Sequence, residues 1–103
     1  MPINESGFIE IIIPHSEGMG LDVRNEIEEK LEELFDYDNR AAVGGAGVGL
    51  GYSNIDVDVG NCEDNLEIVS IIRGVMLEIG VPEGCIIRLR RPELLEFTVK
   101  IAN

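Results

Sequence analysis

The chain has little of what most catalytic and metal-binding sites are built from. Its 103 residues include one histidine, two cysteines, no tryptophan and 5% aromatic residues. Cys62 and Cys85 form no CxxC pair and have no histidine beside them, which is not zinc spacing. His15, the single histidine, stands beside no recognisable nucleophile pattern. We therefore expect a protein that is not an enzyme and that holds no metal and no cofactor.

Positive charge is also scarce. The chain has eight Lys and Arg residues and 20 Asp and Glu residues, which gives a formal net charge of −12. Such a surface repels nucleic acid and anionic membranes, and it attracts basic proteins. We expect a basic protein partner, such as a toxin, and neither nucleic acid nor a membrane. The plain alternative is that the acidic surface only keeps a small protein in solution.

Long apolar runs are missing as well. The longest stretches, such as residues 11–13, are sized for strands, whereas a membrane-spanning helix needs about 20 apolar residues. The opening MPINESG lacks the basic and apolar regions of a signal peptide. The length suits a single domain over residues 1–103, and we expect it in the cytoplasm.

Short β-branched stretches alternate with two stretches of helical periodicity. We expect strands at 8–14, 54–60, 85–91 and 95–101, and helices at 22–35 and 64–80. Pro92 makes the last stretch either one bent strand or two. This order predicts an α+β protein, a ferredoxin-like βαββαβ sandwich with an antiparallel sheet in the order 4-1-3-2 and both helices on one face. The expected inward residues are Ile9, Ile11, Ile13, Val23, Ile27, Leu31, Leu34, Ile55, Val57, Val59, Ile68, Ile72, Met76 and Ile79.

The most unusual stretch is VGGAGVGLGYSNIDVDVG, residues 43–60. Its glycines match neither the dinucleotide pattern GxGxxG nor a Walker A loop, and a strand follows where both motifs need a helix. Gly45, Gly47, Gly49 and Gly51 are at alternate positions, so an extended chain would have one face without side chains there. We interpret the segment as an edge strand or part of a hairpin, with Tyr52–Asn54 resembling a turn. A glycine-rich edge could also pair with a second copy and form a homodimer.

Two groups of side chains are candidate sites. The outward face of the helix at 22–35 carries acids with few interleaved bases, and we predict a partner-binding surface at Glu28, Glu29, Glu32, Glu33, Asp36 and Asp38. The loop before that helix ends at a helix N-terminus and could bind a small molecule through His15, Ser16, Gly18, Gly20 and Arg24. The acids Glu17 and Asp22 in the same segment would repel an anion.

A third acidic group lies on the predicted sheet. Asp56 and Asp58 alternate with inward residues, and Glu10 is expected on the neighbouring strand. Cross-strand ion pairs with Arg88 and Arg90 explain these carboxylates better than a metal ion does.

The hairpin GGxGxG…NIDVDV, followed by a helix and GVPEGCIIR, resembles small uncharacterised bacterial proteins of ferredoxin-like type. Some of these are grouped with immunity proteins of polymorphic toxin systems. The resemblance covers residues 43–87 and implies a single cytoplasmic domain, but no site residues carry over from it. We predict a non-enzymatic interaction module, an acidic inhibitor or immunity-type protein that covers a basic partner. The alternatives are a small-molecule-binding regulatory domain and a self-associating structural protein.

Overall fold

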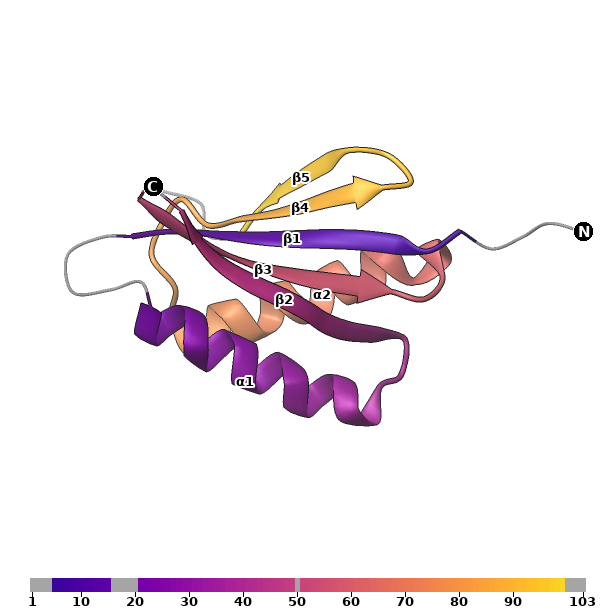
Figure 1. The fold of residues 1–103 in the computed structure, drawn as a ribbon, viewed down its shortest axis with the longest axis horizontal. Coiled ribbons are helices and arrows are strands. Elements are labelled where there is room, and N and C mark those ends of the chain that lie inside the picture. Colours follow the sequence, from indigo (N-terminus) through magenta and orange to yellow (C-terminus); the bar gives the residue numbers. More distant parts are fainter. Residues whose placement is uncertain (1–4, 16–20, 50, 100–103) are drawn as a thin grey trace, which may run out of the picture.

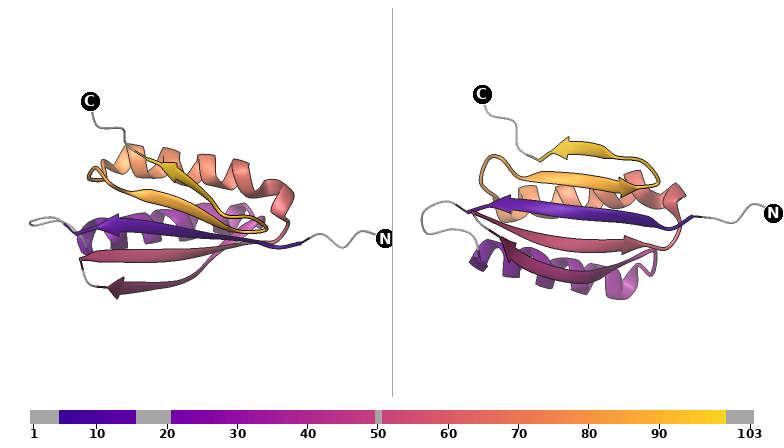
Figure 2. Two further views of the ribbon diagram at one scale, coloured as in Figure 1. Left: turned by 90° about the horizontal axis from the view of Figure 1, so that it is seen from above. Right: turned by 45° about the horizontal axis from the view of Figure 1, so that its top comes forward.

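The computed structural model describes residues 5–15, 21–49 and 51–99. Within them the chain forms β1 (Gly7–Pro14), α1 (Leu21–Tyr37), β2 (Ala41–Gly49), β3 (Tyr52–Val59), the short 3-10 helix η1 (Cys62–Asp64), α2 (Asn65–Ile79), β4 (Ile86–Arg91) and β5 (Leu95–Thr98). The strands form one antiparallel sheet in the order β2-β3-β1-β4-β5. Both long helices lie on one face of it (Figure 1). The other face, which no described element covers, is called the open face here (Figure 2).

The α+β architecture is confirmed, whereas the strand order differs from the predicted four-stranded 4-1-3-2. The segment after Pro92 forms a strand of its own, β5, which pairs with β4 from Leu89↔Leu95 to Ile86↔Thr98. β5 therefore replaces β4 as the edge of the sheet. Proline has no N–H to give to a ladder, so the chain leaves the sheet at Pro92 and turns back on itself.

The core lies between the sheet and the two helices. Strand alternation sends Ile9, Ile11 and Ile13 of β1 inward, and Ile55 and Val57 of β3 meet them with no exposed surface. The predicted inward residues are all buried or, for Val23, Leu34 and Ile79, partly buried against the core. The predicted register is therefore confirmed, because a shift by one residue would have turned every one of these strand side chains outward.

The glycine-rich segment is the edge strand β2. Gly45, Gly47 and Gly49 lie opposite Asp56, Asn54 and Tyr52 of β3, so the glycines belong to the open face. A register irregularity between Val43 and Gly45 marks a bulge near the start of the strand. The turn predicted at residues 52–54 from their residue types is not found there. Those residues belong to β3, and the turn before them contains Gly51 with φ of 81°.

Candidate functional site

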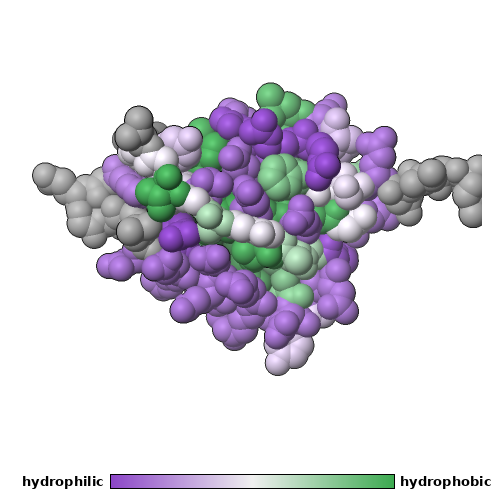
Figure 3. Space-filling model, in the orientation of Figure 1, coloured by the Kyte–Doolittle hydropathy of each residue, from purple (hydrophilic) through white to green (hydrophobic). Residues whose placement is uncertain are grey.

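The acids of α1 point away from the sheet because the helix buries its other face. Ile27, Leu31 and Phe35 pack into the core at helical spacing. Four of the predicted partner-binding residues are consequently exposed, Glu29, Glu32, Glu33 and Asp36. The space-filling view shows a strongly hydrophilic surface in the region of α1 (Figure 3).

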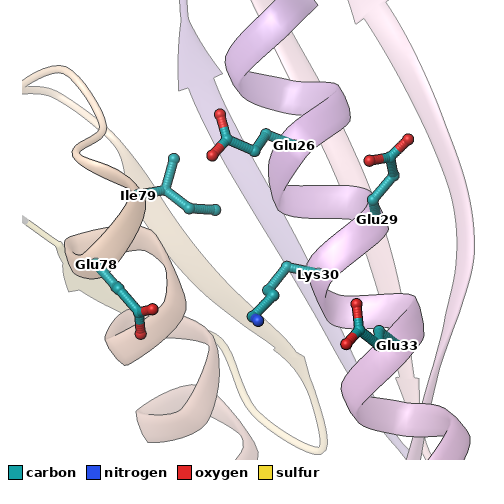
Figure 4. A pocket seen from close by; sticks show the side chains of 6 residues that line it. All are labelled: Glu26, Glu29, Lys30, Glu33, Glu78 and Ile79. Carbon is teal, nitrogen blue, oxygen red and sulfur yellow. The ribbon is translucent and has the colours of Figure 1, made fainter.

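Two of these acids line a hollow of about 310 Å³ between the two helices, which we call the acidic groove. Glu26, Glu29, Lys30 and Glu33 of α1 line it together with Glu78 and Ile79 of α2 (Figure 4). The lining thus includes four glutamates and a single lysine. Like charges along a concave wall reinforce each other's potential, so the groove attracts cations more strongly than isolated glutamates would.

Glu26 and Glu78 were not among the predicted site residues. Glu26 precedes Glu29 by three positions and Glu33 by seven, a spacing that places all three on one side of a helix, so the sequence did contain that signal. Glu78 belongs to the other helix. Only the packing of α2 beside α1 brings it to the groove, and the periodicity of either helix alone does not predict that.

Two predicted residues are engaged within the chain. The Glu28 carboxylate lies 3.8 Å from the Arg24 guanidinium. Asp38 follows the end of α1 and accepts two hydrogen bonds from the Arg40 guanidinium, at 2.8 and 2.6 Å, and a third from the Arg40 backbone N–H at 3.2 Å. These bonds hold the pKa of Asp38 down at about 2. Arg40 also reaches Glu67 of α2 at 2.9 Å, so it connects the end of α1 to the start of α2.

The loop proposed as a small-molecule site is only partly described. Ser16, Gly18 and Gly20 lie outside the described residues. The His15 ring nitrogen Nε2 lies 2.5 Å from the Ser53 hydroxyl, which is fully buried on β3. Arg24 lies on α1 beside Glu28, and its Nε is buried without a hydrogen-bond partner among the described residues. His15 therefore joins the end of β1 to β3 through this hydrogen bond. The described residues of the loop form no ligand site.

The open face carries the third acidic group. Arg88 and Arg90 of β4 both reach Glu10, at 3.4 and 3.1 Å, as predicted. The corresponding prediction for Asp56 and Asp58 is wrong, since neither has an arginine partner in the described part of the chain. The reason is topological, because β1 lies between β3 and β4. Asp56 instead accepts a hydrogen bond from the Asn54 amide at 3.2 Å. The described residues contain no group of three metal-binding side chains.

Both cysteines are free thiols. Cys62 lies in η1, after β3, and Cys85 lies just before β4. β3 and β4 are both antiparallel to β1 and so parallel to each other, which puts the two thiols at opposite ends of the sheet. Burial raises the pKa of Cys85 to about 11, so this thiol stays protonated near neutral pH.

Comparison with protein-family models, with curated proteins and with solved structures found no match to this chain. In the described segments, neither helix combines the length and the apolar character needed to cross a bilayer.

Proposed function

We propose that this protein is a non-enzymatic interaction module whose acidic groove receives a basic segment of another protein. The observation that carries the proposal is the gathering of Glu26, Glu29 and Glu33 of α1 with Glu78 of α2 around one hollow. Two helices contribute these carboxylates, so the charge is concentrated in a concavity, where a lysine or arginine side chain can contact several of them at once.

We further propose that the domain is a ferredoxin-like sandwich to which β5 adds an extra edge strand. The succession of neighbours β2, β3, β1 and β4, with both helices on one face, supports this assignment. Together with the resemblance of residues 43–87 to immunity-type proteins, it supports a cytoplasmic inhibitor as the biological role. A toxin with a cationic surface is the partner of matching charge.

A defined cationic probe tests the groove. Binding of a fluorescent lysine-rich peptide is measured by polarisation, with a glycine-serine peptide of equal length as the neutral probe. The groove variant replaces Glu26, Glu29, Glu33 and Glu78 with Gln. The matched control replaces four other exposed acids, Glu5, Glu63, Glu83 and Glu93, with Gln. Both variants lose four negative charges, so they differ only in where the charges were.

We expect the groove variant to bind the lysine-rich peptide at least about tenfold more weakly than the control variant, because each lost contact between close opposite charges weakens binding. The same pair of variants then serves as bait in extracts of the native host. A basic protein captured by the wild type and the control, and lost with the groove variant, is the expected partner. Equal peptide binding by both variants would show that net charge alone attracts cations, and the groove proposal would fail.

A further inference from the structure

On the open face of the sheet, two aspartates and three arginines lie on opposite sides of the central strand β1. Asp56 and Asp58 lie on β3, to one side of the central strand β1. Three arginines lie on β4, on the other side of β1, and they are Arg88, Arg90 and Arg91. These are three of only eight basic residues in a chain with 20 acidic ones. Their confinement to one strand makes the open face unlike the acidic surface of α1.

The charges are aligned in rows that cross the sheet. Asp58, Phe8 and Arg91 form one row, because Phe8 pairs with both of the others. Asp56, Glu10, Arg88 and Glu96 of β5 form the next row, and in it Arg88 already contacts Glu96 at 2.7 Å and Glu10 at 3.4 Å. Within one chain Asp58 and Arg91 are separated by two strand spacings, about 10 Å, so they are too far apart to pair with each other.

We propose that the open face is the contact surface for a second copy of this chain, related by a two-fold axis that runs parallel to β1. Such an axis turns the β4 side of one copy over the β3 side of the other. Asp58 then faces Arg91 of the second copy, and Asp56 faces Arg88. A two-fold axis across the strands would instead place acids over acids and arginines over arginines. The charges therefore favour the axis parallel to β1. With that axis, the open face of one copy is complementary to the open face of the other.

Two further features of the face suit this occupant. Phe8, Ile12 and Ile86 are only half-buried on it, with Ile12 and Ile86 paired beyond Glu10 at one end of β1 and Phe8 at the other end. The Arg91 guanidinium lies over the Phe8 ring at 5.5 Å, so one side of it contacts the ring while its remaining donors are available. Glu10, which lies near the proposed axis, already has Arg88 and Arg90 as partners. The two Glu10 carboxylates of a dimer would therefore meet with their charges compensated.

Asp58 and Arg91 offer the sharpest test, because neither forms an ion pair within the described part of its own chain. Sedimentation equilibrium over a wide range of concentration measures the dissociation constant of the dimer. Asp58→Arg alone, or Arg91→Asp alone, places like charges opposite each other at two symmetry-related positions. Each variant should raise the dissociation constant by about tenfold or more. Mixing the two variants in equal amounts should restore association, since opposite charges meet at both positions of the mixed dimer.

Asp36→Arg on α1 and Arg73→Asp on α2 are the matched controls, since both positions are exposed and lie away from the open face. They should leave the dissociation constant unchanged, alone and mixed. Rescue in the mixture also demonstrates that both single variants are folded. A wild-type chain that stays monomeric at every concentration overturns the proposal. So does a dimer that tolerates both reversals, and pairing through the exposed edge of β2 is then the next surface to test, with Gly45→Pro.

Discussion

Asn65 is a polar residue in the core, only 3% exposed, at the start of α2. Its amide nitrogen donates to the Arg91 carbonyl oxygen at 3.0 Å, which ties α2 to the end of β4. Its Oδ1 has no hydrogen-bond partner among the described residues and lies against Gly7. A β-carbon at position 7 would come within 1.8 Å of that oxygen. The absence of a side chain at Gly7 is therefore a packing requirement.

Gly7→Ala should lower the free energy of unfolding by about 1–3 kcal/mol, because the buried Asn65 is held by its hydrogen bond and cannot move aside without losing it. Urea unfolding followed by circular dichroism measures the change. Gly45→Ala is the control, since a β-carbon there meets nothing within 4 Å. Equal stabilities of the two variants would contradict this account of Gly7.

Asp38 gives the stability of the protein an acid-sensitive component. Arg40 holds the pKa of Asp38 at about 2, below its ordinary value of 3.8. A carboxylate whose pKa is depressed by folding stabilises the protein above its unfolded pKa, and that contribution is lost as the pH falls from about 4 to about 2. Asp38→Asn should therefore lower the melting temperature at neutral pH, and the difference from the wild type should shrink below about pH 4 and disappear as the pH falls through about 2.

Thermal unfolding measured at several pH values tests this behaviour. Asp36→Asn removes an exposed carboxylate of α1 and serves as the control, with no comparable difference from the wild type at any pH. A difference between Asp38→Asn and the wild type that is constant from pH 7 to pH 2 would show that the contact with Arg40 does not depend on the charge of Asp38.

At the scale of elements, α2 has one glycine in its interior and another directly after its end, and the two have opposite roles. Gly80 ends the helix in the left-handed conformation, with φ of 88°, and its N–H donates to the Met76 carbonyl at 3.0 Å. Gly74 lies in the middle of the same helix, is exposed, and has open space where a β-carbon would be. The first glycine is required by its backbone conformation, and the second weakens the helix.

Replacing glycine with alanine should therefore have opposite effects on stability at positions 80 and 74. Gly80→Ala should destabilise the protein by about 1–2 kcal/mol, because alanine is strained at positive φ. Gly74→Ala should stabilise it by about 1 kcal/mol, because alanine favours the helix interior. Chemical denaturation of both variants gives the two values. Destabilisation by Gly74→Ala would mean that the exposed side of α2 has a packing partner.

The elements themselves could be predicted wherever their residues are strictly periodic. Ile9, Ile11 and Ile13 alternate, so β1 and its inward face were predictable from the sequence. The sequence around Pro92 was compatible with either one bent strand or two strands, because a proline interrupts the hydrogen-bond ladder in both cases. The groove was predictable in part, because Glu29 and Glu33 follow from the α1 pattern, whereas Glu78 reaches it through helix packing alone.

At the scale of the whole molecule, the two proposed surfaces lie on opposite sides. The acidic groove is formed by the helices, and the open face is the side of the sheet away from them (Figure 2). A basic partner on the helices and a second copy on the sheet would therefore not compete for the same residues. Such a dimer would present two acidic grooves facing outward, and a partner with two basic sites could bind both of them.

The central position of β1 has a consequence for how the chain is made. β1 is synthesised before the other four strands of the described sheet, yet its two neighbours in that sheet are β3 and β4. The contact between Glu10 and Arg88 joins residues 78 positions apart. At ordinary translation rates β1 would wait roughly 4 to 16 seconds for β4 to be synthesised. During that time the edge of β1 that will pair with β4 has no partner strand in the growing chain.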